Sequence, residues 1–183
     1  FLHGVAWSCD VYWYKVGGGY GTEVPTGLGI WRMNEYAAAL GYGEPTGIEL
    51  PGEAGGLLPD PTWKRTTLAE NWSTGDTYIA TMGQGFVLST PLQVLVSVAT
   101  LANDGIHMKP TLIKQVTDNE GNVIVPFTPT TVADITKDKV ITVYDENSYA
   151  TEEKISVEPW VIELAQQGMR LVTLPGGTAE DVF

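Results

Sequence analysis

A hydroxyl and a carboxylate lie two residues apart in the stretch Trp7-Ser8-Cys9-Asp10, which heads a run of aromatic side chains ending at Tyr14. Serine and aspartate side chains accept hydrogen bonds from the free N–H groups of a helix's first turn, so helix capping alone would explain the triplet. The same residues could instead belong to a catalytic centre. The spacing by itself favours the cap and leaves the catalytic hypothesis open.

Other residues with metal-binding or nucleotide-binding chemistry give weaker signals. His3 and His107 are far apart in sequence, and neither has a partner at helical or turn spacing, so each is expected to be a core or surface histidine. Residues 82–86, Met-Gly-Gln-Gly-Phe, contain a GxG without the strand and helix context of a dinucleotide site. The sequence therefore predicts neither a metal site nor a cofactor.

Six tryptophans could line a sugar-binding groove. Trp31 and Trp160 fall in helical patterns, where core packing or a half-buried face is the usual role. Trp63 and Trp72 lie in loop-like sequence and are better candidates for the wall of a ligand site.

Composition limits the class of protein and of partner. At 183 residues and 43% hydrophobic, the chain is long enough for one domain with a substantial core. A formal net charge of −12 argues against a nucleic-acid partner, since binding polyphosphate needs clustered lysine and arginine. The single cysteine, Cys9, rules out an intrachain disulfide and a cysteine-based zinc cage. A chain that starts at Phe1 is expected to be a piece of a longer protein.

The elements that must position these residues are mostly helical. The stretch around Ser8 belongs to an opening helix that is broken by the glycines at 17–19, and a second helix is expected over about 30–40. The clearest helix start is at 90–93, where Thr90 can cap, Pro91 fits the first helical position and Gln93 completes a capping box. This helix is apolar nearly all round, so we expect it to be the buried central helix of the domain.

The rest of the chain is more irregular. Dense proline and glycine over 44–63 exclude a long regular element, and Gly83-Gln84-Gly85 reads as a tight turn. The segment 115–158 carries much of the acidic excess and is expected to be a solvated surface insert. Sequence patterns also predict a hairpin of strands at 111–116 and 122–127, a strand at 139–144, and a last helix over 157–172 capped by Ser156.

Five stretches, in this order, resemble the class B penicillin-binding proteins, and most closely the penicillin-binding protein 2 group that builds side wall in rod-shaped bacteria. They are SCDVYWYKVG, GYGEPTGIELPGEAGGLLPDPTWK, GDTYIATMGQGFVLSTPLQ, LANDGIHMKPTL and GMRLVTLPGGTAEDVF. The resemblance covers about 1–115 and 157–183 and leaves only the acidic segment without a clear counterpart. It implies an α+β fold, namely part of a β-lactamase-like transpeptidase domain, mostly its helical part plus a strand hairpin.

The resemblance also assigns roles at the opening triplet. The family works through three motifs, S-x-x-K, S-x-N or S-x-D, and K-[TS]-G, and Ser8-Cys9-Asp10 matches the second. The implied reaction is acyl transfer through a serine between peptidoglycan stem peptides. Because a hydroxyl can accept one proton while donating another, Ser8 would relay a proton to the departing amine. Asp10 would hold the active lysine or a substrate amide, and Gly83-Gln84-Gly85 would support the cleft from beneath.

The other two motifs are missing. No serine has a lysine three residues later, and no lysine is followed by Thr-Gly or Ser-Gly. The stretch PGGTAE at 175–180 resembles the sequence that precedes K-[TS]-G in the family. We therefore expect 1–183 to be part of one transpeptidase domain, starting after the first motif and stopping before the third, and to be inactive alone.

The resemblance implies partners and a location as well. The expected partners are peptidoglycan stem peptides, β-lactams and a membrane glycosyltransferase of the elongation machinery. The longer protein would be anchored in the bacterial cytoplasmic membrane with this domain on the outer side. Two alternatives stay open, a non-catalytic scaffold relative and a glycan-binding wall module that uses the tryptophans.

Overall fold

The computed structural model describes residues 1–147 and 149–182, and helices dominate it. The helices of this part are α1 (Leu2–Ala6), α2 (Asp10–Gly18), α3 (Gly29–Ala39), α4 (Pro61–Leu68), α5 (Thr74–Thr81), α6 (Pro91–Ala102) and α7 (Pro159–Val172). The strands are β1 (Ile106–Met108), β2 (Val116–Thr117), β3 (Val123–Val125), β4 (Thr131–Asp134), β5 (Ile141–Tyr144) and β6 (Ala150–Ile155). None of the described helices is long and apolar enough to cross a membrane.

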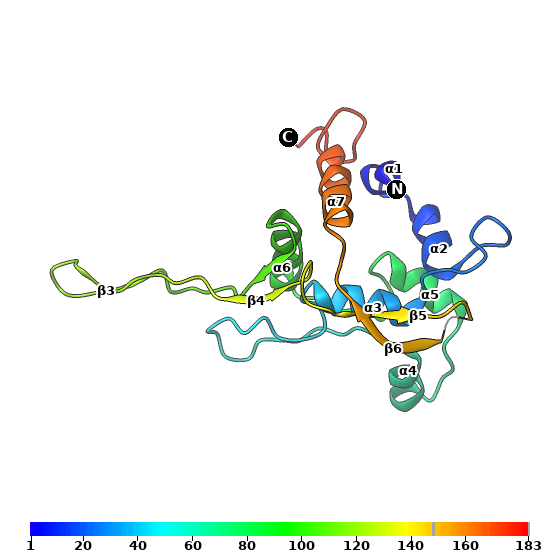
Figure 1. Cartoon of the computed structure of the whole chain (residues 1–183), viewed down its shortest axis with the longest axis horizontal. Helices are drawn as coiled ribbons and strands as arrows, with labels where there is room; N and C mark the ends of the chain where they lie inside the picture. Colours follow the sequence, from blue (N-terminus) through cyan, green and yellow to red (C-terminus); the bar gives the residue numbers. More distant parts are fainter. Residues whose placement is uncertain (148, 183) are drawn as a thin grey trace.

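The strands form three separate antiparallel pairs, β1 with β4, β2 with β3, and β5 with β6. The predicted hairpin is the pair β2–β3, in which Val116 lies opposite Val125, and it projects away from the helices as a long arm (Figure 1). The predicted strand at 139–144 is β5, and it pairs with β6 so that Ile141 faces Ile155. The partial α+β fold is confirmed, with two strand pairs more than the sequence predicted.

Local capping chemistry fixes α6 as predicted. Thr90 and Gln93 form the capping box, and Pro91 occupies the first turn. Gln93 is fully buried, and its side-chain amide also donates to the carbonyl groups of Glu44 (2.8 Å) and Gly55 (2.7 Å). The cap of α6 therefore also holds down the irregular loop that precedes α4.

The prediction that α6 is buried on most sides is wrong for the described part of the chain. Its buried residues are Gln93, Val96, Ser97 and Thr100. Its apolar side chains at Val94, Leu95 and Val98 are 43%, 63% and 41% exposed. Within the described residues no element covers this apolar side, so the helix turns its more polar face inward.

Helix boundaries differ from the prediction where proline sets them. The last helix begins at Pro159 with Glu158 as N-cap, and Ser156 does not cap it. Trp63 was expected in a loop, but it lies in α4, which begins at Pro61 with Asp60 as its cap. Proline suits the first turn of a helix because the N–H that it lacks has no partner there.

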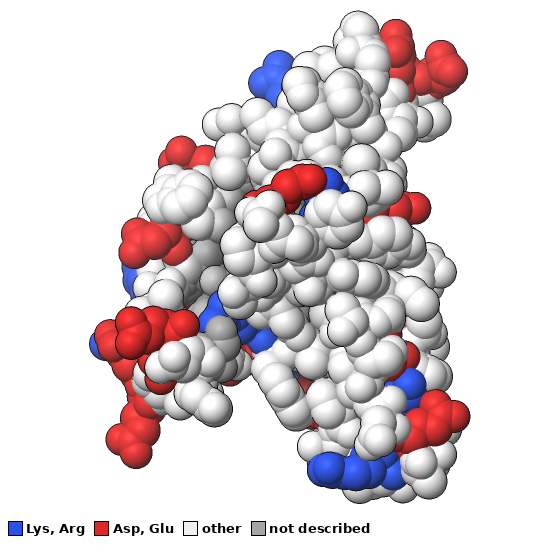
Figure 2. All heavy atoms as spheres, turned by 90° about the vertical axis from the view of Figure 1, so that its right-hand side faces the viewer, with Lys and Arg blue, Asp and Glu red and all other residues white. Residues whose placement is uncertain are grey.

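The main apolar core consists of Ile135, Ile141, Val157 and Ile162. The first three belong to the acidic segment, so 115–158 contributes to the core at these positions, although its β2–β3 arm and all of β6 are exposed. Many large apolar side chains elsewhere remain exposed, so the core is smaller than composition suggested. In the view of Figure 2 acidic side chains run along the left edge of the molecule and also lie at its top right and right edge.

Candidate functional site

Ser8 and Asp10 lie on either side of the junction between α1 and α2. Ser8 has a positive φ of 50°, its N–H donates to Val5 O at 3.1 Å, and the N–H of Cys9 donates to Gly4 O at 3.0 Å. The α2 helix begins at Asp10 with Cys9 as N-cap, and no side chain caps it. The helix-capping explanation of the triplet is therefore wrong.

The backbone at Ser8 is unusual for a residue with a side chain. A residue other than glycine in the left-handed region costs about 1–2 kcal/mol, and such strained residues cluster at functional sites. Ser8 and Asp10 are both exposed, and neither side chain has a hydrogen-bond partner among the described residues. A strained turn thus presents a hydroxyl and a carboxylate with their hydrogen-bonding capacity unused.

Two close helix–helix contacts hold α2, the helix that follows this turn, in place. A β-carbon at Gly4 of α1 would lie 2.6 Å from Tyr12 Cδ1 of α2, and one at Gly17 would lie 2.6 Å from Thr81 Cγ2 of α5. Both glycines are needed because any side chain would push the packed elements apart. The α2 helix is also tied to α5 by Tyr78, whose hydroxyl donates to Gly19 O at 3.0 Å.

The C-terminal stretch 175–180 lies against α1. The N–H of Thr178 donates to Ala6 O at 3.1 Å, and Ala6 is two residues from Ser8. Ala179 N donates back to Val172 O at 2.9 Å, which folds the stretch onto the end of α7. Figure 1 shows both chain ends in the same region of the molecule, beside α1 and α7. The stretch that precedes the third motif in the resembled family is thus brought next to the second.

Aromatic residues lie near the candidate site in the sequence and pair with one another. The rings of His3 and Trp7 stack with their centroids 4.6 Å apart, and Phe1 meets Trp13 edge-on at 5.9 Å. Trp7 directly precedes Ser8 and is 58% exposed, so it can form an apolar rim beside the hydroxyl. Cys9 is half-buried.

The turn at Gly83-Gln84-Gly85 closes the C-terminal end of α5, the helix on which α2 packs. Gly83 and Gly85 both have positive φ, and a β-carbon at Gly85 would lie 2.9 Å from Ile79 Cγ2. These contacts support the packing explanation of the turn. Its link to the candidate site runs through α5 rather than through any direct contact.

A buried ion pair joins α4 to α5. Lys64 Nζ lies 2.9 Å from Asp76 Oδ2, and Asp76 also completes the capping box of Ser73. Burial alone would raise the pKa of Asp76, but hydrogen bonds from Lys64 and Ser73 outweigh it and lower that pKa. The pair fixes α4 at the start of α5, a structural role that sequence spacing did not reveal.

Trp63 and Trp72, the expected ligand-wall residues, are engaged within the protein. The ring of Trp63 packs against Phe86 with centroids 5.2 Å apart, and Trp72 Nε1 donates to Thr77 Oγ1 at 2.9 Å. Both side chains are half-buried. Trp63 thus ties α4 to the loop after α5, and Trp72 ties the loop before α5 to that helix.

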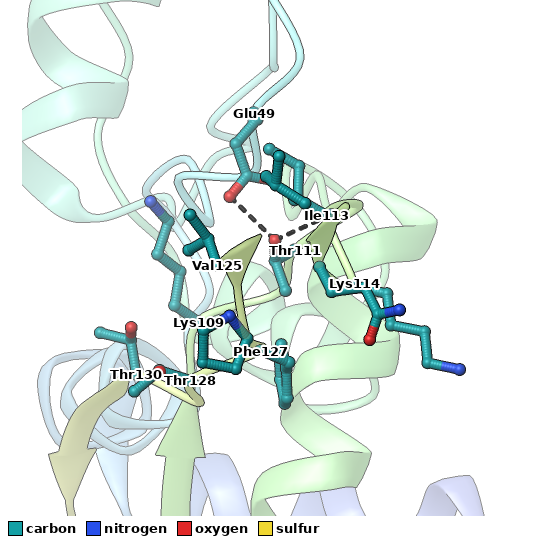
Figure 3. A pocket seen from close by; sticks show the side chains of 12 residues that line it. Glu49, Lys109, Thr111, Ile113, Lys114, Val125, Phe127, Thr128 and Thr130 are labelled. Atoms are coloured by element: carbon teal, nitrogen blue, oxygen red, sulfur yellow. Dashed lines mark hydrogen bonds between the residues drawn. The ribbon is translucent and has the colours of Figure 1, made fainter. Parts of the chain in front are cut away.

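A cavity of about 150 Å³ at the base of the β2–β3 arm also has a structural explanation (Figure 3). Glu49 accepts hydrogen bonds there from Leu112 N at 3.1 Å and from Thr111 Oγ1 at 3.0 Å. The Leu112 N–H is the main reason that the pKa of Glu49 is lowered. These contacts fasten the loop before α4 to the arm.

His107 is buried on β1, where it packs against Gly41. Only 9% of the residue is exposed, and its Nε2 has no hydrogen-bond partner among the described residues. Burial lowers the pKa of His107. No group of three or more His, Cys, Asp or Glu side chains within the described residues could hold a metal ion.

A pH-dependent stability follows from His107. Its folded pKa is below its unfolded value of about 6.5, so protons bind the unfolded chain preferentially and stability falls as pH drops below that value. We expect a lower thermal midpoint at about pH 5.5 than at about pH 7.5. His107→Gln should remove most of this difference, because the carboxylates with shifted pKa values are lowered and stay charged in this range. If His107→Gln showed the same difference in thermal midpoint between the two pH values, this pH dependence would not come from His107.

Comparison with known proteins matches the whole chain to one family. The model described as "Penicillin binding protein transpeptidase domain" matches residues 2–182, which include the acidic segment. The peptidoglycan D,D-transpeptidase MrdA of Acinetobacter baumannii is 36% identical over 107 residues, 58% of this chain and 15% of that protein. MrdA of Haemophilus influenzae is 34% identical over 134 residues, 73% of this chain and 19% of that protein.

Solved structures of penicillin-binding proteins have a similar fold. A solved complex between penicillin-binding protein PBP2 and MreC from Helicobacter pylori has a TM-score of 0.66 and 26% identity. The similarity covers 98% of this chain and 27% of that one. The chain therefore spans between one seventh and about one quarter of the length of the proteins described here.

Proposed function

Because the chain belongs to the penicillin-binding protein transpeptidase domain family, with PBP2-type relatives, we propose that it is part of a peptidoglycan D,D-transpeptidase that works through a serine acyl-enzyme. The observation that carries the proposal is the Ser8 turn. A serine with positive φ presents an unengaged hydroxyl beside Asp10, in the triplet that matches the second motif of the family. Such a turn has no structural purpose as a cap.

In the proposed reaction, the nucleophilic serine and its lysine come from outside this chain. The serine oxygen bonds to the carbonyl carbon between the two terminal D-alanines of a stem peptide, and the C–N bond to the last D-alanine breaks. Ser8 passes the serine's proton to the departing amine, since a hydroxyl can accept and donate at once. An amine of a neighbouring strand then attacks the ester, which forms the cross-link and returns a proton to the serine.

The positions of the chain's segments agree with this division of roles. Asp10 stands at the first turn of α2, next to the relay hydroxyl, and would orient the lysine or a substrate amide. The stretch 175–180 lies against Ala6, so a strand that follows it would begin close to Ser8. We propose that 1–183 is one part of a single domain, with the S-x-x-K motif before it and the K-[TS]-G motif after it.

The partners and location are proposed from the relatives. The PBP2 of Helicobacter pylori was solved with MreC, and we propose a comparable place in the elongation machinery, with a membrane glycosyltransferase as the partner enzyme. The substrates would be stem peptides, and β-lactams would be inhibitors. The longer protein would be anchored in the cytoplasmic membrane, with this domain on its outer side.

The 183-residue chain alone should form no covalent adduct with a fluorescent penicillin, whereas the full-length gene product should be labelled. Covalent catalysis needs an activated nucleophile, and no serine here has a lysine at the required spacing. The measurement is in-gel fluorescence after denaturation, with unlabelled penicillin as competitor. A full-length protein that resists labelling would favour a non-catalytic scaffold instead.

A further inference from the structure

Two exposed apolar side chains flank the triplet that carries Ser8 and Asp10. Trp7 directly precedes the triplet and is 58% exposed, and Val11 directly follows it and is 61% exposed. Successive Cα atoms are about 3.8 Å apart, so each of these side chains begins beside one of the two polar groups. Ligand sites combine apolar walls with a few placed polar groups, and the triplet with its neighbours offers that combination.

The indole of Trp7 has one face held and one face open. The ring of His3 stacks on it, with centroids 4.6 Å apart and ring planes 5° apart. Trp7 N donates to His3 O at 3.0 Å, so the helical spacing that puts both residues on one side of α1 continues to the end of the helix. Because the stack covers one face of an indole that is 58% exposed, the other face is open to solvent among the described residues.

The other sides of α1 are in contact with neighbouring elements. Gly4 packs against α2, and Val5 packs against α7, where a β-carbon at Gly168 would lie 3.1 Å from Val5 Cγ2. Ala6 O accepts from the N–H of Thr178, in the stretch that folds back on α1. The side that carries the two stacked rings stays exposed, at the end of α1 where the triplet begins.

The other exposed tryptophans lack this position. Trp31 lines a cavity between α3, the β5–β6 pair and the loop before α4, and Trp160 is 61% exposed at the start of α7. Among the described residues neither ring pairs with another aromatic ring. Trp7 is therefore the exposed tryptophan that is both fixed by a second ring and next to a candidate catalytic residue.

We propose that Trp7 selects among the acyl donors of the proposed transpeptidase, on whose activity this role rests. Its open face packs against an apolar substituent of the donor beside the scissile carbonyl. In a stem peptide such substituents are the methyl groups of the terminal D-alanines, and in a penicillin the substituent is the acyl side chain. His3 is a positioning residue, because its ring holds the indole in one orientation. Contacts of aromatic rings with each other add affinity beyond the area that they bury.

The test compares benzylpenicillin, which has an aromatic acyl side chain, with aminopenicillanic acid, which has the same ring system and no acyl side chain. With either compound the serine oxygen bonds to the β-lactam carbonyl carbon, the ring C–N bond breaks and the ring nitrogen takes the proton. Intact-protein mass spectrometry of the full-length protein gives both acylation rates. We expect Trp7→Ala to slow acylation by benzylpenicillin about tenfold and to leave acylation by aminopenicillanic acid unchanged.

Three further variants separate stacking from a general effect. Trp7→Phe keeps a flat ring and should retain most of the preference for benzylpenicillin. His3→Ala should lower that preference by a smaller factor than Trp7→Ala, because the indole stays in place but can rotate. The matched control is Trp160→Ala, which removes an indole of similar exposure on α7 and should react like the parent protein.

Equal slowing with both compounds in Trp7→Ala would indicate a structural role and would overturn the proposal, as would an unchanged preference. If Trp7→Ala fails to fold, His3→Ala carries the test, and a preference equal to that of the parent protein would then overturn it. A parent protein that neither compound acylates would reject the proposed function and the role of Trp7 together. Acylation of the parent without any dependence of the preference on Trp7 would reject the role of Trp7 alone.

Discussion

Ser8→Ala in the full-length protein is expected to lower the rate of acylation by a fluorescent penicillin about 100-fold, because positioned proton transfer typically contributes that much. The domain should stay folded. The Ser8 hydroxyl caps no helix and has no partner among the described residues, so its loss removes no structural hydrogen bond. The measurement is the second-order acylation rate, taken with the thermal midpoint of the same sample.

Two substitutions of Asp10 test its role in the same acylation assay. Asp10→Asn should be milder than Asp10→Ala, because the amide keeps an acceptor oxygen and the shape of the side chain. A Ser8→Ala protein that acylates at the parental rate would contradict the relay. Equal loss in the two Asp10 variants would contradict the orienting role of the acceptor oxygen.

Gly17→Ala is expected to destabilise the protein by about 2 kcal/mol, as overpacking of a tight contact does. In an exposed helix the same change would stabilise by up to about 1 kcal/mol. At position 17 the change is destabilising instead, because the new β-carbon would overlap the side chain of Thr81. That side chain is held in place by its own hydrogen bond to Thr77 O. Because α2 would have to move, acylation should also slow.

The matched control is Gly75→Ala in α5. A β-carbon there would lie 3.5 Å from Ser73 Oγ, an ordinary contact, so this change should leave stability equal or slightly higher. Thermal and urea unfolding of the two full-length variants would show the difference. A Gly17→Ala protein as stable as the Gly75→Ala protein would mean that α2 and α5 are less tightly packed than described.

Local chemistry in the sequence predicted local structure well. The Thr90 capping box and the glycine break after α2 depend on neighbouring residues, so both could be identified. The start of α7 was placed two residues early because Ser156 is a good capping residue, but Pro159 sets the boundary. The α4 and α5 helices are short, and the surrounding prolines and glycines concealed them.

The candidate site depends on contacts that the sequence does not encode locally. The triplet was identified by resemblance, but its left-handed turn depends on how α1 docks, for example where Val5 meets Gly168 of α7. The cavity beside Trp31 joins three segments that are distant in sequence. Pattern alone gave Trp31 an ordinary packing role.

Composition overestimated the core for a different reason. The apolar residues of α6 indicate a helix that is buried in the complete fold. This chain, however, covers only 27% of the Helicobacter pylori PBP2 chain that it resembles. Leu95 and its neighbours are therefore apolar in sequence and exposed here. This agrees with the proposal that further polypeptide completes the domain.

Locating the acyl group tests the central claim most directly. The full-length gene product is treated with penicillin, digested, and analysed by tandem mass spectrometry for the serine that carries the adduct. We expect one modified serine, outside residues 1–183 and three residues before a lysine, and no modification of Ser8. An adduct on any serine within 1–183 would contradict the division of catalytic roles that places Ser8 as the proton relay.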